Sequence, residues 1–165
     1  MITKNEVLDN LEEVKKYVSE IETKKEVKGI AILNRYNDEV IFQSTKTTMK
    51  EAVEEAVEKS ANLKDANLEN ADLKSANLKD ANLKYANLEN ANLENANLED
   101  ANLENANLKY ANLEYANFED ANLKSANLKS ANLKYANLKS AKTTFCTVNF
   151  SSSEKEQAEQ FIKGL

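Results

Sequence analysis

A five-residue unit, Ala-Asn-Leu followed by two variable residues, recurs without a break from residue 61 to residue 140. All 16 units begin with Ala, the second residue is Asn except at Asp72, and the third is Leu except at Phe118. The variable positions hold only Lys, Glu, Asp, Asn, Ser or Tyr, which tolerate water. Any fold of this segment must therefore provide an interior position for Leu in every unit.

Neither regular element provides that position. On an α-helix a step of five turns each Leu by roughly 140° relative to the last, so no apolar face forms. On a flat strand an odd period sends Leu63 and Leu68 to opposite faces, and half of the leucines would meet water. Both problems disappear if the chain bends once per unit in a constant sense. The period therefore predicts a solenoid with Leu and the smaller Ala inside.

The solenoid assigns a role to each position of the unit. The two variable residues point outward, and the Asn of the second position is structural, because Asn can hydrogen-bond to the backbone of its own turn and tolerates the unusual dihedral angles of tight bends. The predicted structural core is Leu63, Leu83, Leu93, Leu103, Leu113, Phe118 and Leu133.

Units such as Ala-Asn-Leu-Lys-Asp, Ala-Asn-Leu-Glu-Asn and Ala-Asp-Leu-Lys-Ser resemble the consensus of the pentapeptide-repeat family. The resemblance covers about half of the chain. It implies a mainly β fold, a right-handed quadrilateral β-helix with four units per coil. Residues 61–140 would then form about four coils.

Composition argues against catalysis. The chain of 165 residues has no His, one Cys and two Gly. The usual general base and the commonest metal ligand are thus missing, one Cys cannot make a zinc site, and no glycine-rich phosphate loop is present. We therefore expect no enzyme, no cofactor and no metal. Cys146 takes the Ala position of a degenerate unit, which favours an interior packing thiol over a reactive one.

No run approaches the roughly 20 apolar residues of a membrane span, and the first residues lack the apolar core of a signal peptide. We expect a cytoplasmic protein with no membrane contact.

Atypical segments flank the repeat, as an open solenoid requires at its ends. We divide the chain into an N-terminal helix, β-hairpin and capping helix (1–60), the solenoid with two degenerate units (61–150) and a C-terminal capping helix (151–165). Residues 27–34 and 39–44 read as the hairpin strands. Thr48 to Glu51 reads as a capping box that opens a helix to about Lys59. Its apolar side should cover the first coil.

The first segment carries apolar residues at alternating steps of four and three, the spacing of a coiled-coil seam. This seam packs against the hairpin or joins two copies of the chain. The candidate cap or dimer contacts, at both ends of the chain, are Val7, Leu11, Val14, Val18, Ile21, Phe161 and Ile162. We favour a homodimer formed through the terminal segments.

If residues four units apart stack, one face carries a column of acids: Asp80, Glu99, Asp100, Glu119 and Asp120. Some pentapeptide-repeat proteins are acidic DNA mimics that bind DNA gyrase and inhibit it or protect it from quinolones. The acidic face stops short, however, because residues 121–140 hold four lysines and no acid. The same register stacks Tyr115 over Tyr135.

The favoured interpretation is a non-enzymatic β-solenoid that acts as a structural or protein-interaction scaffold, with no direct contact to nucleic acid. The alternative is a DNA mimic that binds a type II topoisomerase through the acidic face.

Overall fold

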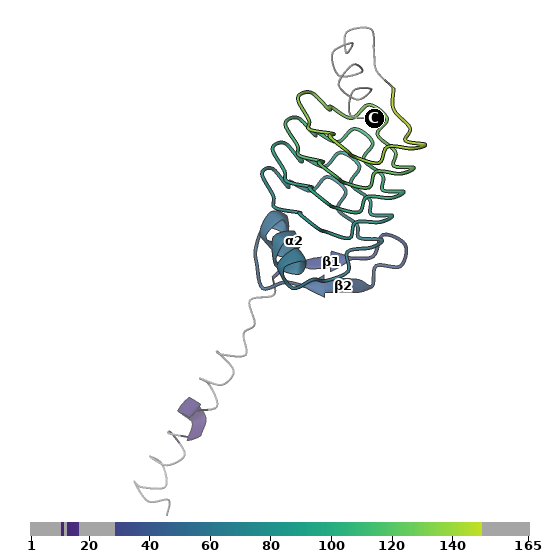
Figure 1. Ribbon diagram of the computed structural model, residues 1–165. Coiled ribbons are helices and arrows are strands. Elements are labelled where there is room, and N and C mark those ends of the chain that lie inside the picture. The colour runs from purple at the N-terminus through teal and green to yellow at the C-terminus, as the bar shows by residue number, and fades with distance from the viewer. Residues whose placement is uncertain (1–10, 12, 17–28, 150–165) are drawn as a thin grey trace, which may run out of the picture.

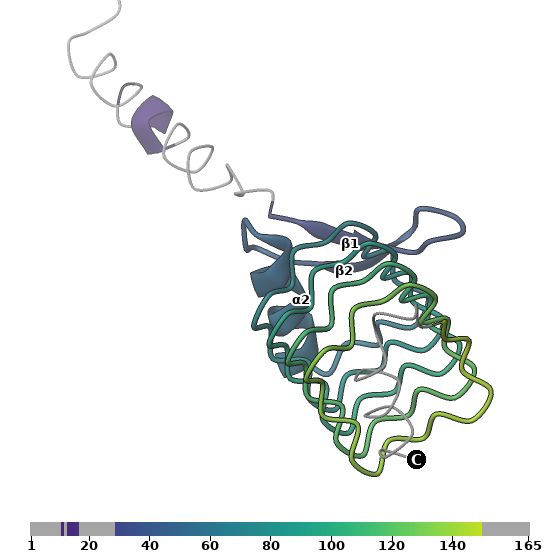
Figure 2. The same ribbon diagram turned by 90° about the horizontal axis from the view of Figure 1, so that it is seen from above.

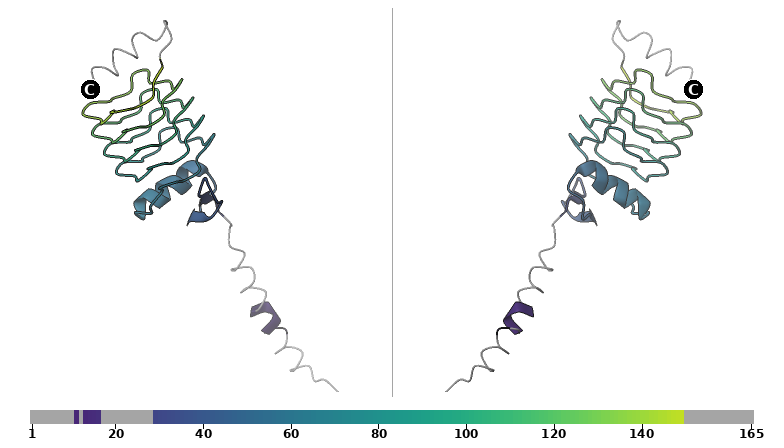
Figure 3. Two further views of the ribbon diagram at one scale, coloured as in Figure 1. Left: turned by 90° about the vertical axis from the view of Figure 1, so that its right-hand side faces the viewer. Right: turned by 90° about the vertical axis from the view of Figure 1, so that its left-hand side faces the viewer.

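The computed structural model describes residues 11, 13–16 and 29–149. A short antiparallel hairpin of β1 (Ala31–Leu33) and β2 (Val40–Gln43) comes first, followed by helix α2 (Met49–Glu58). The repeats then wind into a stack of coils (Figure 1). The hairpin and α2 lie at one end of this stack, and the last described residues lie at the other (Figures 1 and 3).

One coil takes 20 residues, because parallel bridges join the second residue of each unit to the second residue four units later. These bridges run from Asn67↔Asn87 to Asn127↔Thr147, and they continue beyond the last regular unit. From residue 71 on, each regular unit contributes one bridged residue between two turns and no longer strand. The repeat region is thus a β-solenoid of four units per coil, and successive coils stack along it (Figure 2).

Leu and Ala fill the interior. The third residue of every unit from residue 63 to residue 138 is at most 4% exposed, and Phe118 is fully buried among the leucines. Leu63, Leu83, Leu93, Leu103 and Leu113 are also fully buried, and Leu133 is 2% exposed. Only small Ala fits beside them at the first position, where the chain turns inward. The alternation of large and small residues explains why both positions are nearly constant.

The residue with the unusual backbone dihedral angle is the fifth residue of each unit, and not the Asn at the second position. Every fifth residue from Asp65 to Phe145 has a positive φ, between 53° and 62° for the set that begins at Ser60. The Asn side chain instead closes the turn, since its Oδ1 accepts from the N–H two residues on, as in Asn92 with Glu94 at 3.2 Å. The hydrogen bond to its own turn is as expected, but the expectation of an unusual dihedral at Asn is wrong.

The Asn side chains also connect the coils. Nδ2 of one Asn donates to Oδ1 of the Asn one coil earlier, for example Asn132 to Asn112 and Asn112 to Asn92, at 3.1 and 3.3 Å. One oxygen therefore accepts a bond within its turn and a bond from the next coil. Asp72, the single exception, supplies only oxygens and accepts from Asn92 at 3.1 Å.

Helix α2 forms where the capping box predicts it. The N-cap Thr48 accepts from the N–H of Glu51 at 3.2 Å and its hydroxyl donates to the Glu51 carboxylate at 2.9 Å. The helix ends at Glu58, one residue before the expected end. Its Ala52, Val53 and Ala56 are fully buried.

The hairpin and α2 contact the first coil through both apolar and polar groups. Val53 and Ala56 belong to the same buried cluster as Ile32 of β1 and Leu63 of the coil. The backbone of the hairpin continues into the coil, where Asn34 bridges to Ala66 in antiparallel fashion. The strands lie inside the two segments expected from the sequence but are shorter.

The degenerate units after residue 140 continue the coil. Lys142 and Thr147 take the bridged position, and Thr143 takes the Leu position at 5% exposure. The hydroxyl of Thr143 is buried without a hydrogen-bond partner. Cys146 is partly buried and its Sγ donates to the carbonyl of Leu123 at 2.7 Å. Burial raises the pKa of this thiol, which suits the packing role. The expected C-terminal helix lies outside the described residues.

Candidate interaction surfaces

The five acids of the candidate acidic face lie on one side of the coil. Asp80, Asp100 and Asp120 are fifth residues of units one coil apart, and the bridges Asn77↔Asn97 and Asn97↔Asn117 hold these units in register. Backbone bonds fix the column as well, since the N–H of Asp80 donates to the carbonyl of Glu99 at 3.0 Å. The structure therefore brings the predicted residues together as a column, with the glutamates beside it.

Lysines neutralise part of this face. Lys79 Nζ lies 2.5 Å from Glu99 Oε1 and 3.8 Å from Asp100 Oδ2, and Lys139 forms an ion pair with Glu119. The hydrogen bond from Lys139 lowers the pKa of Glu119, and the hydrogen bond to Glu99 raises the pKa of Lys79. Both glutamates are thus paired and Asp100 also lies within ion-pair distance of Lys79, so the lysines offset part of the charge of the column.

The same pairing recurs around the coil. Fourth residues 20 apart form ion pairs at Lys74 with Glu94 (3.0 Å), Lys84 with Glu104 (3.0 Å) and Lys109 with Glu89 (3.4 Å). A hydrogen bond from Asn107, together with Lys109, lowers the pKa of Glu89. Because these pairs are partly exposed to solvent, they contribute less to the contact between coils than the backbone hydrogen bonds and the buried leucines do.

Tyrosines form a second kind of surface feature. The rings of Tyr115 and Tyr135 stack with centroids 4.9 Å apart, which confirms the predicted pair. Lys134 Nζ lies 4.9 Å from the Tyr135 ring centroid, and Lys109 Nζ lies 4.5 Å from the centroid of Tyr110. Tyr110 and Tyr115 are 51% and 52% exposed. Tyr110 and Tyr135 are thus each contacted by the lysine of their own unit, whereas Tyr115 is contacted by the ring of Tyr135.

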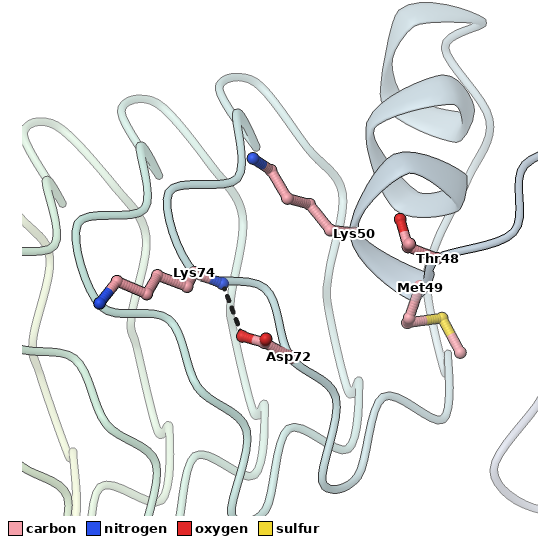
Figure 4. Close-up of a pocket in the computed structure, with 5 residues that line it drawn as sticks. All are labelled: Thr48, Met49, Lys50, Asp72 and Lys74. Atoms are coloured by element: carbon pink, nitrogen blue, oxygen red, sulfur yellow. Dashed lines mark hydrogen bonds between the residues drawn. The ribbon is translucent and has the colours of Figure 1, made fainter.

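A hollow of about 340 Å³ lies between the start of α2 and the third repeat unit, lined by Thr48, Met49, Lys50, Asp72 and Lys74 (Figure 4). Oδ1 of Asp72 accepts from the backbone N–H of Lys74 at 3.2 Å. Asp72, the one Asp among the repeat asparagines, thus lines the same hollow as the first residues of α2.

The part of the chain that the structure describes holds no group of three or more His, Cys, Asp or Glu side chains arranged for a metal ion. Among the same residues, no helix is long and apolar enough to cross a bilayer.

Of the predicted seam, the structure describes Leu11 and Val14, while Val7, Val18 and Ile21 lie outside the described residues, as do Phe161 and Ile162. Leu11 and Val14 lie in helical backbone and are 48% and 57% exposed. Because three of its five residues lie outside the described residues, the packing of the seam stays a prediction.

Several contacts escaped the sequence analysis. Arg35, the single arginine, donates from Nη1 to the carbonyl of Tyr85 at 2.9 Å, across 50 positions of sequence. Glu54 accepts from the N–H of Asn77 at 2.8 Å and so joins α2 to the coil. A lone arginine in a lysine-rich chain was the available signal for the first. Nothing in the sequence marks Glu54 among its neighbouring glutamates.

The chain is similar to known repeat proteins. A family model of pentapeptide repeats matches residues 61–100, 86–124, 101–139 and 111–151, with 8 copies. No curated protein matches the chain in a sequence comparison.

Solved structures resemble it too. The crystal structure of the pentapeptide repeat protein Rfr23 from the cyanobacterium Cyanothece 51142 is 43% identical with a TM-score of 0.50, covering 52% of this chain and 58% of Rfr23. HetL, involved in heterocyst differentiation regulation in Nostoc sp. strain PCC 7120, is 40% identical with a TM-score of 0.49, covering 50% of this chain and 38% of HetL. The chain thus spans well under two thirds of either protein.

Proposed function

Because the chain belongs to the pentapeptide repeat family, we propose that it is a non-enzymatic interaction scaffold built on a right-handed, four-sided β-helix. In this proposal the hairpin and α2 cap the first coil, and the terminal segments join two copies. The observation that carries the proposal is the regular outer surface, in which bonded coils present charged and aromatic side chains in fixed columns. Such a surface suits the display of contacts to another protein.

The dimer is supported by the exposed side chains of Leu11 and Val14, which are three residues apart on helical backbone. Two copies of this helix would bury these groups against each other in the manner of a coiled-coil seam. Light scattering on the eluting protein should give twice the chain mass of 18.5 kDa. The double variant Leu11→Asp, Val14→Asp should give the single mass, while Glu13→Lys, at an exposed position of the same helix, should leave the dimer intact.

A monomer at all concentrations would remove the dimer from the proposal and leave the scaffold function standing. A variant that remains dimeric would place the contact elsewhere in the chain.

A second function rests on the acidic face: imitation of DNA toward a type II topoisomerase such as DNA gyrase. The column of Asp80, Asp100 and Asp120 supports it, because the three carboxylates repeat along one side of the coil. The lysines at both ends of this column and the basic last coil weaken the likeness to a phosphate backbone.

A gyrase supercoiling assay with rising amounts of the protein, with and without a quinolone, distinguishes the two functions. The scaffold predicts no change in supercoiling at a large excess over the enzyme. Mimicry predicts inhibition or protection that is lost when the five acids of the face become Asn or Gln. The control replaces Glu69, Glu89 and Glu94 by Gln on other sides of the coil and should leave any effect unchanged.

A further inference from the structure

Two tyrosines of the repeat, one coil apart, stack their rings on the outside of the solenoid. The rings of Tyr115 and Tyr135 have centroids 4.9 Å apart and planes inclined by 22°. Tyr85 and Tyr110 occupy the same position of their units, but the residues 20 positions before and after them are Asp, Asn or Ser. Among the described residues, Tyr115 and Tyr135, which we call the tyrosine pair, are thus the one stacked pair of aromatic rings.

The coils hold the backbone of the tyrosine pair in register. The N–H of Tyr115 donates to the carbonyl of Lys134 at 3.0 Å, and the N–H of Leu113 donates to that of Asn132 at 2.8 Å. The φ angles of Tyr115 and Tyr135 are 59° and 60°, so both side chains leave the same backbone conformation. Neighbouring strands lie about 4.8 Å apart, and the two phenols therefore stay neighbours for as long as the coils are folded.

The two rings are accessible and can turn. Tyr115 is 52% exposed and Tyr135 is 42% exposed. Rotation of an aromatic ring about its Cβ–Cγ bond is broad, and exposed side chains rearrange quickly. The ring edges that carry the Cε atoms, next to the hydroxyl, can therefore meet while the backbone remains in register. A one-electron oxidant in solution reaches both phenols.

We propose that the tyrosine pair is a site of oxidative modification, at which hydrogen peroxide and a haem peroxidase join Tyr115 to Tyr135 as dityrosine. Each phenol loses one electron and one proton, and the two tyrosyl radicals form one carbon–carbon bond between their Cε atoms. The hydrogen on each bonded Cε then moves as a proton to the oxygen of its own ring and restores the phenol. The protein loses two hydrogen atoms in all, and one peroxide is reduced to two waters.

The new bond joins two successive coils. In the folded protein these coils are already held side by side by the bridge Asn112↔Asn132. In the unfolded chain the same bond closes a loop across the 20 positions from Tyr115 to Tyr135 and removes conformations from it. The cross-link therefore acts as a covalent staple that favours the folded stack. This inference goes beyond the scaffold function, since it requires no partner protein.

The test treats the dilute full-length protein with hydrogen peroxide and a haem peroxidase, followed by trypsin digestion and mass spectrometry. Because trypsin cleaves after Lys, the cross-link joins peptides 110–124 and 135–139, at two hydrogen masses below their sum. Fragmentation of the joined peptides should place the bond at Tyr115 and not at Tyr110. This product should exceed every other tyrosine pairing by about tenfold or more, because the stack makes the coupling intramolecular and oriented.

Three variants test whether the stack selects the site. Tyr135→Asn places a residue that tolerates positive φ at position 135, so it should keep the fold and lower the yield of cross-linked Tyr115 by about tenfold or more. The double variant Asn95→Tyr, Tyr135→Asn moves the second phenol to the coil before Tyr115 and should restore the yield, with the bond now between positions 95 and 115. Tyr110→Phe, the matched control in the adjoining unit, should leave the yield unchanged.

The staple has a readout of its own. The cross-linked wild-type protein should melt about 5 °C or more above the untreated protein. The Tyr135→Asn protein, treated in the same way, should melt as it does before treatment. An unchanged melting temperature of the cross-linked wild-type protein would show that the bond does not staple the coils.

Other results would overturn the site itself. One is a main product that joins two chains, which a denaturing gel shows as a doubled mass. Another is an equal yield of the other tyrosine pairings in the folded protein. A third is a double variant that melts like the wild-type protein but forms no bond between positions 95 and 115. None of these results depends on the light-scattering or gyrase assays, so the scaffold function can stand where this inference fails.

Discussion

The fifth residue of each unit, more than the conserved Asn, carries the backbone requirement of the coil. A positive φ is costly for most side chains, and Asn and Asp tolerate it best after Gly. The chain uses Asp, Asn, Ser and Tyr at this position and places every Lys and Glu of the regular units at the fourth. The sequence prediction assigns both variable positions to the outside without distinguishing them, although this difference in composition separates the fourth position from the fifth.

The first prediction concerns Asn90, an exposed fifth residue with a φ of 58°. Asn90→Val should lower the free energy of unfolding by about 1–2 kcal/mol, because a β-branched side chain clashes in the left-handed region. Asn90→Gly should cost much less. Urea unfolding measures both, and Lys124→Val at an exposed fourth position is the control. Equal losses for Val at positions 90 and 124 would contradict the assignment.

The interior position gives the second prediction. Leu113 is fully buried between coils, so Leu113→Ala should lower the free energy of unfolding by about 2–5 kcal/mol through lost burial and the cavity left behind. Glu114→Gln, on the next residue, keeps a side chain that can accept from Asn132 and should change little. If thermal melts showed equal losses of stability for both variants, the assignment of Leu113 to the interior and Glu114 to the surface would be wrong.

At the scale of elements, the hairpin and α2 are locked together by Glu55. Its carboxylate accepts from the buried hydroxyl of Ser44 and from Lys59 Nζ, the latter at 2.5 Å. The hydrogen bond from Lys59 and then that from Ser44 lower the pKa of Glu55 to about 2. The ionised form is therefore bound more favourably in the folded protein than in the unfolded chain.

The third prediction follows from the sign of that shift. A lowered carboxyl pKa contributes stability that is present above the unfolded value near 4.5 and is lost as pH falls toward about 2. Urea unfolding between pH 7 and pH 2 should show Glu55→Gln less stable than the wild-type protein at neutral pH, with the difference closing below about pH 4. Glu58→Gln, exposed on the same helix, should show no such closing gap. If the stability difference between the wild-type protein and Glu55→Gln did not change with pH, the ionised carboxylate of Glu55 would not be what stabilises this contact.

The sequence predicted these elements better than their contacts. The capping box at Thr48 and the β-branched runs around residues 35–38 are local signals, and α2 and the hairpin form there. The bonds of Arg35 to Tyr85 and of Glu54 to Asn77 join segments 50 and 23 residues apart. Such contacts depend on where the first coil meets the hairpin, which no local pattern encodes. The need for glycine at position 29 also comes from a contact between separate segments, since a Cβ there would lie 2.2 Å from the carbonyl oxygen of Ser44.

For the whole molecule, the five-residue period determines which features of the fold can be predicted from the sequence. Register, interior and the stacking of Tyr115 on Tyr135 all follow from a step of four units, and so does the column of Asp80, Asp100 and Asp120. The role of that column does not follow, because nearly identical units offer no residue set apart by function. The units that depart from the pattern at Asp72 and Thr143 lie in the first coil and after the last regular unit, next to the ends of the stack.

The fourth prediction tests the period itself. Deletion of a complete unit, residues 91–95, returns every later Leu to the interior, because all units present the same Ala, Asn and Leu to their neighbours. Deletion of Asn95 alone moves each later Leu out of its position. Circular dichroism melts should show that the five-residue deletion is the milder one, despite removing more chain. The reverse order would contradict a coil held by equivalent units.

Among the described residues, the backbone bonds between coils connect each repeat unit to the units 20 residues before and after it. The contacts at either end of the stack therefore do not depend on the number of coils between the ends. Inserting 20 residues of the same pattern would move the hairpin and α2 away from the last coil by about 4.8 Å, the spacing of neighbouring strands, and leave the contacts of both unchanged. The solenoid is in this sense a spacer of adjustable length, whose two ends can be separated in equal steps without redesigning either.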